Sequence, residues 1–174
     1  MDFRVSREAF LRVLTHVSSI VDSRSTIPIL SNIYLKCENN QIEIRSTDMD
    51  ISIREFVSCD STKNGEATVN SRILTDIIRK TKKNSIVKCK LEGNRLIINS
   101  DNSVFELNAL SADEFPKFVP LDATNSFELT IPQMKRLFNK TKFAISAEET
   151  RYYLNGIYFH TVANGSKTAL RCVA

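Results

Sequence analysis

The 174-residue sequence contains no tryptophan, only four glycines and only four cysteines. So few glycines, in no motif, argue against a glycine-rich phosphate loop and against a Gly-x-Ser-x-Gly nucleophile turn. The cysteines stand singly at Cys37, Cys59, Cys89 and Cys172, with no Cys-x-x-Cys pair and no histidine at ligand spacing. This pattern argues against a zinc site and against a secreted disulfide framework. It favours buried free thiols in a cytosolic protein.

Residues that could support catalysis or hold a metal are equally scarce. Asp48-Met49-Asp50 places two acids around a turn, which is more typical of turn and edge residues than of a metal site. His16 and His160 have no cysteine or aspartate partner at ligand spacing. The sequence also has no paired-carboxylate motif of the kind used for acid–base catalysis. We therefore expect no catalytic residue, no metal and no cofactor.

Long apolar runs are also missing, and residues 1–4 do not resemble a signal peptide. A composition that is 42% hydrophobic and 25% charged is ordinary for a soluble globular chain. We expect a cytoplasmic protein with no membrane partner.

The most informative feature that is present is an internal repeat. Apolar and aromatic residues recur at a constant separation of 124 positions over more than thirty residues. The corresponding pairs are Phe3 and Phe127, Val5 and Leu129, Phe10 and Met134, Leu14 and Phe138, Leu30 and Leu154, Ile33 and Ile157, and Tyr34 and Tyr158. We expect a first domain over residues 1–122 and a second, truncated domain over residues 123–174, so that the chain is a fragment of a longer protein.

The first domain is itself predicted to contain two similar modules. Apolar residues at helical spacing predict helices over 6–19 and 71–83, and alternating residues predict one strand before each helix and three strands after it. The sequence of 38–46 is echoed by that of 92–100. Two strand-helix-three-strand modules give an α+β fold in which the sheets are buried against the apolar stripes of the helices.

The second domain is expected to follow a linker over 111–125 that contains two prolines and several aspartates. A strand is predicted at 127–129, a helix at 131–143 and a strand at 168–173. This is the same order of elements as at the start of the first domain.

Charge is distributed unevenly between the helices and the rest of the chain. The three predicted helices hold eleven basic and two acidic residues, a net charge of +9, while the remainder holds 13 basic and 18 acidic residues, a net charge of −5. The basic residues are Arg7, Arg12, Arg72, Arg79, Lys80, Lys82, Lys83, Lys135, Arg136, Lys140 and Lys142. Solvated helix faces are one explanation, but they do not explain why acids avoid these helices. Binding of a polyanion through its phosphates explains the asymmetry better, and long cations without Asn or Gln indicate sequence-independent contact.

Several stretches of the sequence resemble one known family. They are FRVSREAFL at 3–11, PILSN at 28–32, STD at 46–48, ADEFP at 112–116 and RYYLNG at 151–156. These stretches are similar to the bacterial DNA polymerase III beta subunit, the sliding clamp, and the similarity runs in register along the whole chain. The resemblance implies a DNA-clamp fold, in which three double-module domains form a chain and two chains close head to tail into a ring. Basic helices would line the inner face of the ring, and antiparallel sheets would form its outer rim.

The resemblance also implies a function without catalysis. A clamp is a processivity factor that encircles duplex DNA and tethers the replicative polymerase, acting in the cytoplasm in association with the nucleoid. Its implied partners are double-stranded DNA, a second copy of itself, the DNA polymerase III catalytic subunit, the clamp loader, and repair polymerases and mismatch-repair proteins that carry a short linear motif. The alternatives are a nuclease whose active site lies outside these residues, and a small-molecule binding domain, which leaves the helix charge unexplained.

Individual DNA contacts are implied by the same resemblance. Arg24 and Arg72 match arginines that contact the duplex, and Tyr152 and Tyr153 match other residues that face DNA. Arginines can hold phosphates, and tyrosines offer hydroxyl donors and flat faces, although an aromatic pair packed on the core is the alternative. Glu148 stands where the family often has a neutral polar contact, and a carboxylate there would repel phosphate.

Two further pairs of residues match interaction surfaces of the family. Arg151 and Leu154 match one wall of the pocket that accepts the short linear motif of partner proteins. Phe105 and Leu107 match the strand that meets the partner chain in the dimer, but their alternation also fits the core of their own domain.

Overall fold

A computed structural model describes residues 1–21, 27–117, 126–165 and 167–174. The chain forms two compact units, residues 1–120 and residues 121–174. The domain boundary predicted between 122 and 123 lies outside the described residues and stays a prediction.

Unit 1 contains the two predicted modules, which confirms the α+β assignment. The first module consists of β1 (Asp2–Ser6), α1 (Arg7–Val17), β2 (Asn32–Glu38), β3 (Gln41–Thr47), β4 (Ser52–Ser58) and β5 (Asp60–Lys63). The second consists of β6 (Gly65–Asn70), α2 (Ser71–Lys80), β7 (Ile86–Glu92), β8 (Arg95–Ser100) and β9 (Ser103–Leu110). Short 3₁₀ helices lie at η1 (Ser18–Ile20), η2 (Pro28–Ser31) and η3 (Ala112–Glu114). The strand β5 was not predicted, because its four polar residues carry no apolar alternation.

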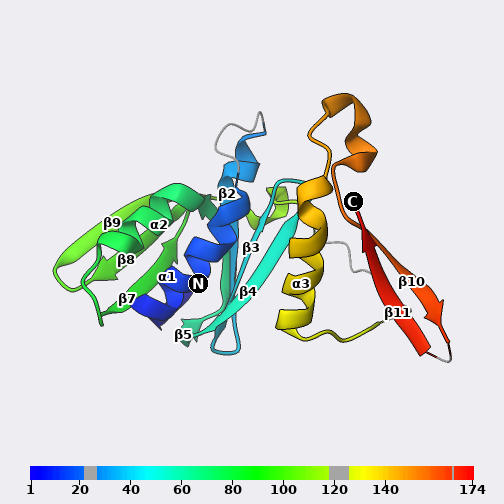
Figure 1. Ribbon diagram of the computed structural model, residues 1–174. Coiled ribbons are helices and arrows are strands. Elements are labelled where there is room, and N and C mark those ends of the chain that lie inside the picture. Colours follow the sequence, from blue (N-terminus) through cyan, green and yellow to red (C-terminus); the bar gives the residue numbers. More distant parts are fainter. Residues whose placement is uncertain (22–26, 118–125, 166) are drawn as a thin grey trace. The chain divides into compact units, whose positions relative to one another are not determined.

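The strands form one antiparallel sheet in the order β4-β3-β2-β6-β9-β8-β7-β1-β5. The two halves of this sheet join through β6 and β9, which pair only at Thr68 with Leu110 and at Val69 with Ala109. Residues 103–108 of β9 pair with β8 alone among the described strands. Both helices lie side by side against the sheet (Figure 1).

The core of unit 1 fills the space between the helices and the sheet. The stripe on α1 that helical spacing predicts is buried, with Phe10, Leu14 and Val17 at 0% exposure. From α2, Leu74 and Ile78 enter the same core. The strands supply alternate residues, the pattern expected where one face of a sheet is covered. Packing of the apolar helix faces against the sheet accounts for most of the stability of helices this short.

Unit 2 repeats the beginning of unit 1. It contains α3 (Ile131–Thr141), η4 (Lys142–Ala144), η5 (Glu149–Leu154), β10 (Tyr158–Asn164) and β11 (Lys167–Val173). The bounds of α3 and η4 lie 124 residues after those of α1 and η1, the separation found in the sequence. The β10–β11 hairpin extends further than the corresponding β2–β3 hairpin of unit 1. Its last strand pair is Asn164 with Lys167, which lies 126 residues after Glu38 with Gln41, the last pair of β2–β3, and not 124.

The strand predicted at 127–129 is wrong, since residues 126–130 have no regular secondary structure. The corresponding strand of unit 1, β1, is held between β5 and β7. The described part of unit 2 contains no strand equivalent to either of these, so 127–129 has no backbone partner. The helix that follows still begins where expected, with a capping box formed by Thr130 and Gln133.

Candidate nucleic-acid interface

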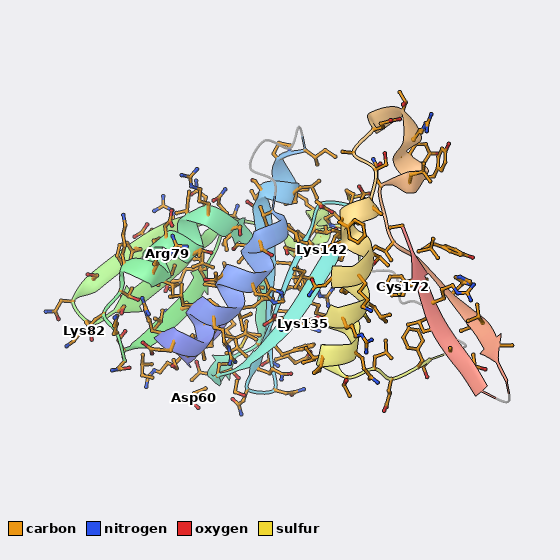
Figure 2. All side chains as sticks on the ribbon, viewed as in Figure 1. Asp60, Arg79, Lys82, Lys135, Lys142 and Cys172 are labelled. Carbon is orange, nitrogen blue, oxygen red and sulfur yellow. The ribbon has the colours of Figure 1, made fainter. Side chains whose placement is uncertain are left out.

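The helices of unit 1 bury one face and expose cations on the other. Arg12 on α1 and Arg72, Arg79 and Lys80 on α2 are exposed, as are two lysines in the turn that follows α2. Figure 2 labels Arg79 near the end of α2 and Lys82 in the turn after it. Only Arg79 among these residues has an acidic partner in the described part of the chain, Asp76, at 2.8 Å. The exposed surface of this helix pair is therefore strongly basic.

Arg7 does not belong to this basic surface, although it was counted among the helix cations. Its side chain is largely buried, and its guanidinium donates from Nε to the carbonyl oxygen of Ile78 at 3.2 Å and from Nη2 to that of Arg79 at 2.7 Å. The last carbonyls of a helix lack intrahelical donors and carry the negative end of the helix dipole, so a cation satisfies them well. Arg7 is a structural residue of the α1–α2 contact.

Arg72, an expected DNA contact, occupies the second position of α2. The helix begins with Asn70, whose side-chain oxygen accepts the backbone N–H of Ile73 at 3.0 Å. Ser18, at the end of α1, contacts Ser71 at 2.7 Å and Thr75 at 3.0 Å through hydroxyl hydrogen bonds. These small polar side chains allow the helices to approach closely and fix the start of α2, where the Arg72 side chain is exposed.

The second arginine implied by the resemblance, Arg24, lies outside the described residues. Tyr152 and Tyr153 lie on η5 of unit 2 and are 78% and 72% exposed, with their rings in an edge-to-face contact at 5.9 Å. In this chain neither ring is buried in a core, and the assignment of both tyrosines as DNA contacts stays a prediction. They could stack on or donate to a nucleic acid without moving.

Glu148 and Arg151, which were expected to belong to different surfaces, form an ion pair of 3.3 Å. Both side chains are well exposed, so the pair is weak and readily exchanged. The arginine offsets part of the carboxylate charge that would repel phosphate. Leu154, three residues further on, is 45% exposed and offers apolar surface beside Arg151 on the same element.

Phe105 and Leu107 lie on β9 on the face that packs against the core. Leu107 is 6% exposed, and Phe105 is partly buried against the core cluster. The prediction that Leu107 packs in the core of its own domain is therefore confirmed, while a role of this strand in a dimer stays a prediction. The edge of β9 itself leaves backbone groups of 103–108 unpaired by other described strands on one side.

Basic patches on unit 2 follow α3. Lys135, Arg136, Lys140 and Lys142 are all exposed, and Figure 2 shows Lys135 and Lys142 along this helix and its extension.

Across the described ranges, no three His, Cys, Asp or Glu side chains are grouped closely enough to hold a metal ion. Of the helices described, none is long and apolar enough to cross a membrane.

One part of this interface was missed by the sequence reasoning. Arg7 was counted only as a helix cation, yet Arg7 contacts the end of α2 and the neighbouring Glu8 contacts the turn after it. A neighbouring Arg-Glu pair at a helix start is common, and nothing in the sequence shows which segment 70 residues away it will reach.

Comparison with known proteins agrees with this geometry. Residues 1–119 match the family described as the DNA polymerase III beta subunit, N-terminal domain. The beta sliding clamp of Caulobacter vibrioides is 39% identical over 176 aligned residues, which cover 100% of this chain and 47% of that protein. The beta sliding clamp of Pseudomonas aeruginosa is 33% identical, with the same coverage of both chains. The chain thus spans about half the length of the curated relatives it matches.

Solved structures show the same fold. The structure of Caulobacter crescentus pol III beta matches with a TM-score of 0.92 and 39% identity, over 99% of this chain and 46% of that one. A DnaN sliding clamp (DNA polymerase III subunit beta) from Bartonella birtlesii bound to griselimycin matches with a TM-score of 0.95 and 37% identity, over 100% of this chain and 46% of that one. With its first 119 residues matching the family's N-terminal domain and its whole length matching these clamps in sequence and fold, the chain belongs to the DNA polymerase III beta subunit family.

Proposed function

We propose that this chain supplies part of a sliding clamp, the non-catalytic processivity factor that encircles duplex DNA and tethers the replicative polymerase. The observation that carries the proposal is the row of exposed cations on α1, α2 and the turn after α2, on the opposite side of the helices from the core. The family assignment supports the same function. No observation favours the nuclease alternative.

The proposed mechanism depends on weak phosphate contacts. Arg12, Arg72 and Lys80 can each neutralise a phosphate and release its counterion, which gives affinity without reading bases. Contacts of this kind exchange rapidly, so a ring that holds DNA by its topology can still slide along it. The tethered polymerase then remains at high effective concentration near the primer end.

Specific residues are assigned within this proposal. Arg24, Arg72, Tyr152 and Tyr153 contact the duplex, the arginines through phosphates and the tyrosines through hydroxyls and ring faces. The exposure of both tyrosines supports their part in this assignment. Glu148 is the doubtful contact, because only its ion pair with Arg151 reduces its repulsion of phosphate.

Protein partners are assigned to two other surfaces. Arg151 and the half-exposed Leu154 form one wall of the pocket for the short linear motif carried by the polymerase III catalytic subunit, the clamp loader, repair polymerases and mismatch-repair proteins. The strand with Phe105 and Leu107 meets a second chain head to tail. The partly unpaired edge of β9 supports this, because free strand edges pair readily with other strands. These partners place the protein in the cytoplasm, associated with the nucleoid.

Fluorescence anisotropy with labelled duplexes of two unrelated sequences tests the proposal. Binding is expected to be weak, equal for both sequences and steeply reduced by salt, with a slope of about −0.9 in log K against log salt for each phosphate contacted. Binding that is insensitive to salt, or that depends strongly on sequence, would contradict it. Incubation with supercoiled plasmid and Mg²⁺ should leave the plasmid uncut, whereas metal-dependent cleavage would support the nuclease instead.

A further inference from the structure

The turn that follows α2 concentrates positive charge on a short segment. Arg79, Lys80, Lys82 and Lys83 place four exposed cations within five consecutive positions, and Figure 2 labels two of them, Arg79 and Lys82. Arg79 is paired with Asp76. The three lysines have no acidic partner in the described part of the chain.

Lysines on the sheet of the same unit are arranged differently. Lys36, Lys88 and Lys90 contact Glu38 at 2.9 Å, Asp2 at 3.9 Å and Glu92 at 2.5 Å, respectively. Each of these cations is offset by a nearby carboxylate. Among the described lysines of unit 1, the turn therefore gathers three neighbouring ones that no carboxylate offsets, whereas the exposed Lys63 on β5 and Lys117 stand singly.

The first residue of α1 holds the start of this turn in place. Arg7 joins the carbonyl oxygens of Ile78 and Arg79 through two nitrogens of one planar guanidinium. A planar fork of donors fixes the direction of two successive carbonyls more tightly than a single flexible ammonium could. Thr81 adds a hydrogen bond from its hydroxyl to the carbonyl of Ile78 at 2.8 Å, and its side chain is buried.

The second residue of α1 holds the end of the turn. The carboxylate of Glu8 accepts the backbone N–H of Asn84 at 2.8 Å, and this bond is the main reason that the pKa of Glu8 is lowered. Asn84 has a positive φ of 58°, a conformation that reverses the chain direction. The backbone N–H of Arg7 donates to the carbonyl of Ser85 at 3.0 Å, and the Ser85 hydroxyl donates to the carbonyl of Lys82 at 2.7 Å.

We infer that the segment Arg79–Asn84 is a preorganised site for phosphates of duplex DNA, with Arg7 and Glu8 as the residues that position it. This inference rests on the proposed function. The turn continues the basic surface of α2, so the same duplex can contact Arg72 at the start of the helix and the lysines beyond its end. Because the backbone is already fixed, binding immobilises only the lysine side chains, and less conformational entropy is lost.

Removal of the three lysine charges tests the site. The triple variant Lys80→Gln, Lys82→Gln, Lys83→Gln is compared with Lys36→Gln, Lys88→Gln, Lys90→Gln, which changes net charge equally on the sheet. Duplex binding is measured by anisotropy between about 20 and 150 mM KCl. The turn variant is expected to lower the magnitude of the salt slope by about 2 to 3, while the sheet variant changes it by less than about 1.

The outcomes separate the two proposals. Equal slopes for both triple variants would overturn the site while leaving the proposed function intact. A wild-type chain that binds no duplex would overturn the proposed function and the site with it. Competition by polyglutamate as effective as competition by unlabelled duplex would assign the turn to an acidic protein surface, and would likewise overturn the inference.

Substitution of Glu8 tests the positioning role, because that role and general electrostatics predict opposite changes in DNA affinity. Glu8→Ala raises the net charge by one, so general electrostatics predicts tighter DNA binding. If Glu8 positions the turn, this variant binds about three- to tenfold more weakly, because a disordered turn loses phosphate contacts. Glu8→Gln retains an oxygen that can accept the Asn84 N–H and should restore binding to at least the wild-type level. Circular dichroism verifies that both variants fold, and tighter binding by Glu8→Ala would refute the positioning role.

Discussion

At the scale of single residues, burial separates side chains that the sequence treats alike. Arg7 and Arg12 lie five positions apart on one helix and carry the same charge, yet Arg7 is buried against α2 while Arg12 is exposed. Charge counting predicted a basic helix face, and the exposed cations agree with it. It could not predict that one of those charges satisfies the carbonyls of another helix.

Arg7 and Arg12 therefore differ in their expected effect on stability. Arg7→Met removes the guanidinium donors to the carbonyls of Ile78 and Arg79, leaving the Ile78 carbonyl only the Thr81 hydroxyl, and we expect a loss of about 1–3 kcal/mol in the free energy of unfolding. Arg12→Met, as a matched control on the exposed face, should change it by less than about 0.5 kcal/mol. Urea denaturation followed by circular dichroism measures both, and equal effects would show that the Arg7 hydrogen bonds contribute little.

The four thiols are expected to differ in reactivity. Burial raises the pKa of Cys59 to about 12 and also raises the pKa of Cys89, so both thiols stay protonated at pH 8. Cys172 is only partly buried and should react first with a disulfide reagent such as DTNB, whereas Cys37, Cys59 and Cys89 should react only on unfolding. Mass spectrometry of the labelled chain identifies the site, and rapid labelling of Cys89 would contradict this order.

The same thiols give a pH dependence of stability. Because these folded-state pKa values are raised above the ordinary value of 9.0, the unfolded chain loses protons first as the pH rises. Their stabilising contribution is complete below about pH 9 and decreases above it. Urea denaturation at pH 7, 9 and 10 is expected to show falling stability, with a smaller fall in Cys89→Ala; an equal fall in that variant would exclude Cys89 as a cause.

At the scale of elements, local patterns predicted most of the architecture. Helices expected at 6–19, 71–83 and 131–143 are observed as Arg7–Val17, Ser71–Lys80 and Ile131–Thr141, because each carries an apolar stripe and a start signal. The errors concern strands, whose existence depends on partners. β5 forms because β1 lies beside it, and 127–129 does not because the described residues offer it no neighbour.

Asn70 links two elements, since it ends β6 and caps α2. Asn70→Ala removes the acceptor for the Ile73 N–H and should cost about 0.5–2 kcal/mol. Asn70→Asp keeps an acceptor at the same position and should cost less. Thermal unfolding of the three proteins measures the difference, and no difference between Ala and Asp would mean that the cap is unimportant here.

At the scale of the whole molecule, the two units differ in how much of their apolar surface is buried. Unit 1 contains both modules and a continuous buried core, while unit 2 leaves Phe143, Tyr158 and several other large apolar or aromatic side chains exposed. The repeat in the sequence predicted that a helix like α1 recurs in this unit, and α3 confirms it, while a truncated second domain stays a prediction. The contacts of Arg7 and Glu8 with the end of α2 and the turn after it could not be predicted from the sequence and are seen only in the folded chain.

Unit 1 is accordingly expected to fold without unit 2. A protein of residues 1–120 should give a cooperative urea transition and amide NMR signals that overlay those of the same residues in the 174-residue chain. Loss of signal dispersion in the shorter protein would show that unit 1 depends on the rest of the chain.

We expect duplex DNA to bind the exposed faces of the helices and to leave the sheet untouched. Amide NMR of the ¹⁵N-labelled 174-residue chain, titrated with a short duplex of arbitrary sequence at low salt, tests it most directly. Shifts are expected at Arg12, Arg72 and the turn of residues 79–84, with few changes on β3 and β4. Shifts confined to the sheet, or none at duplex concentrations of about 1 mM, would contradict the proposed DNA-binding surface.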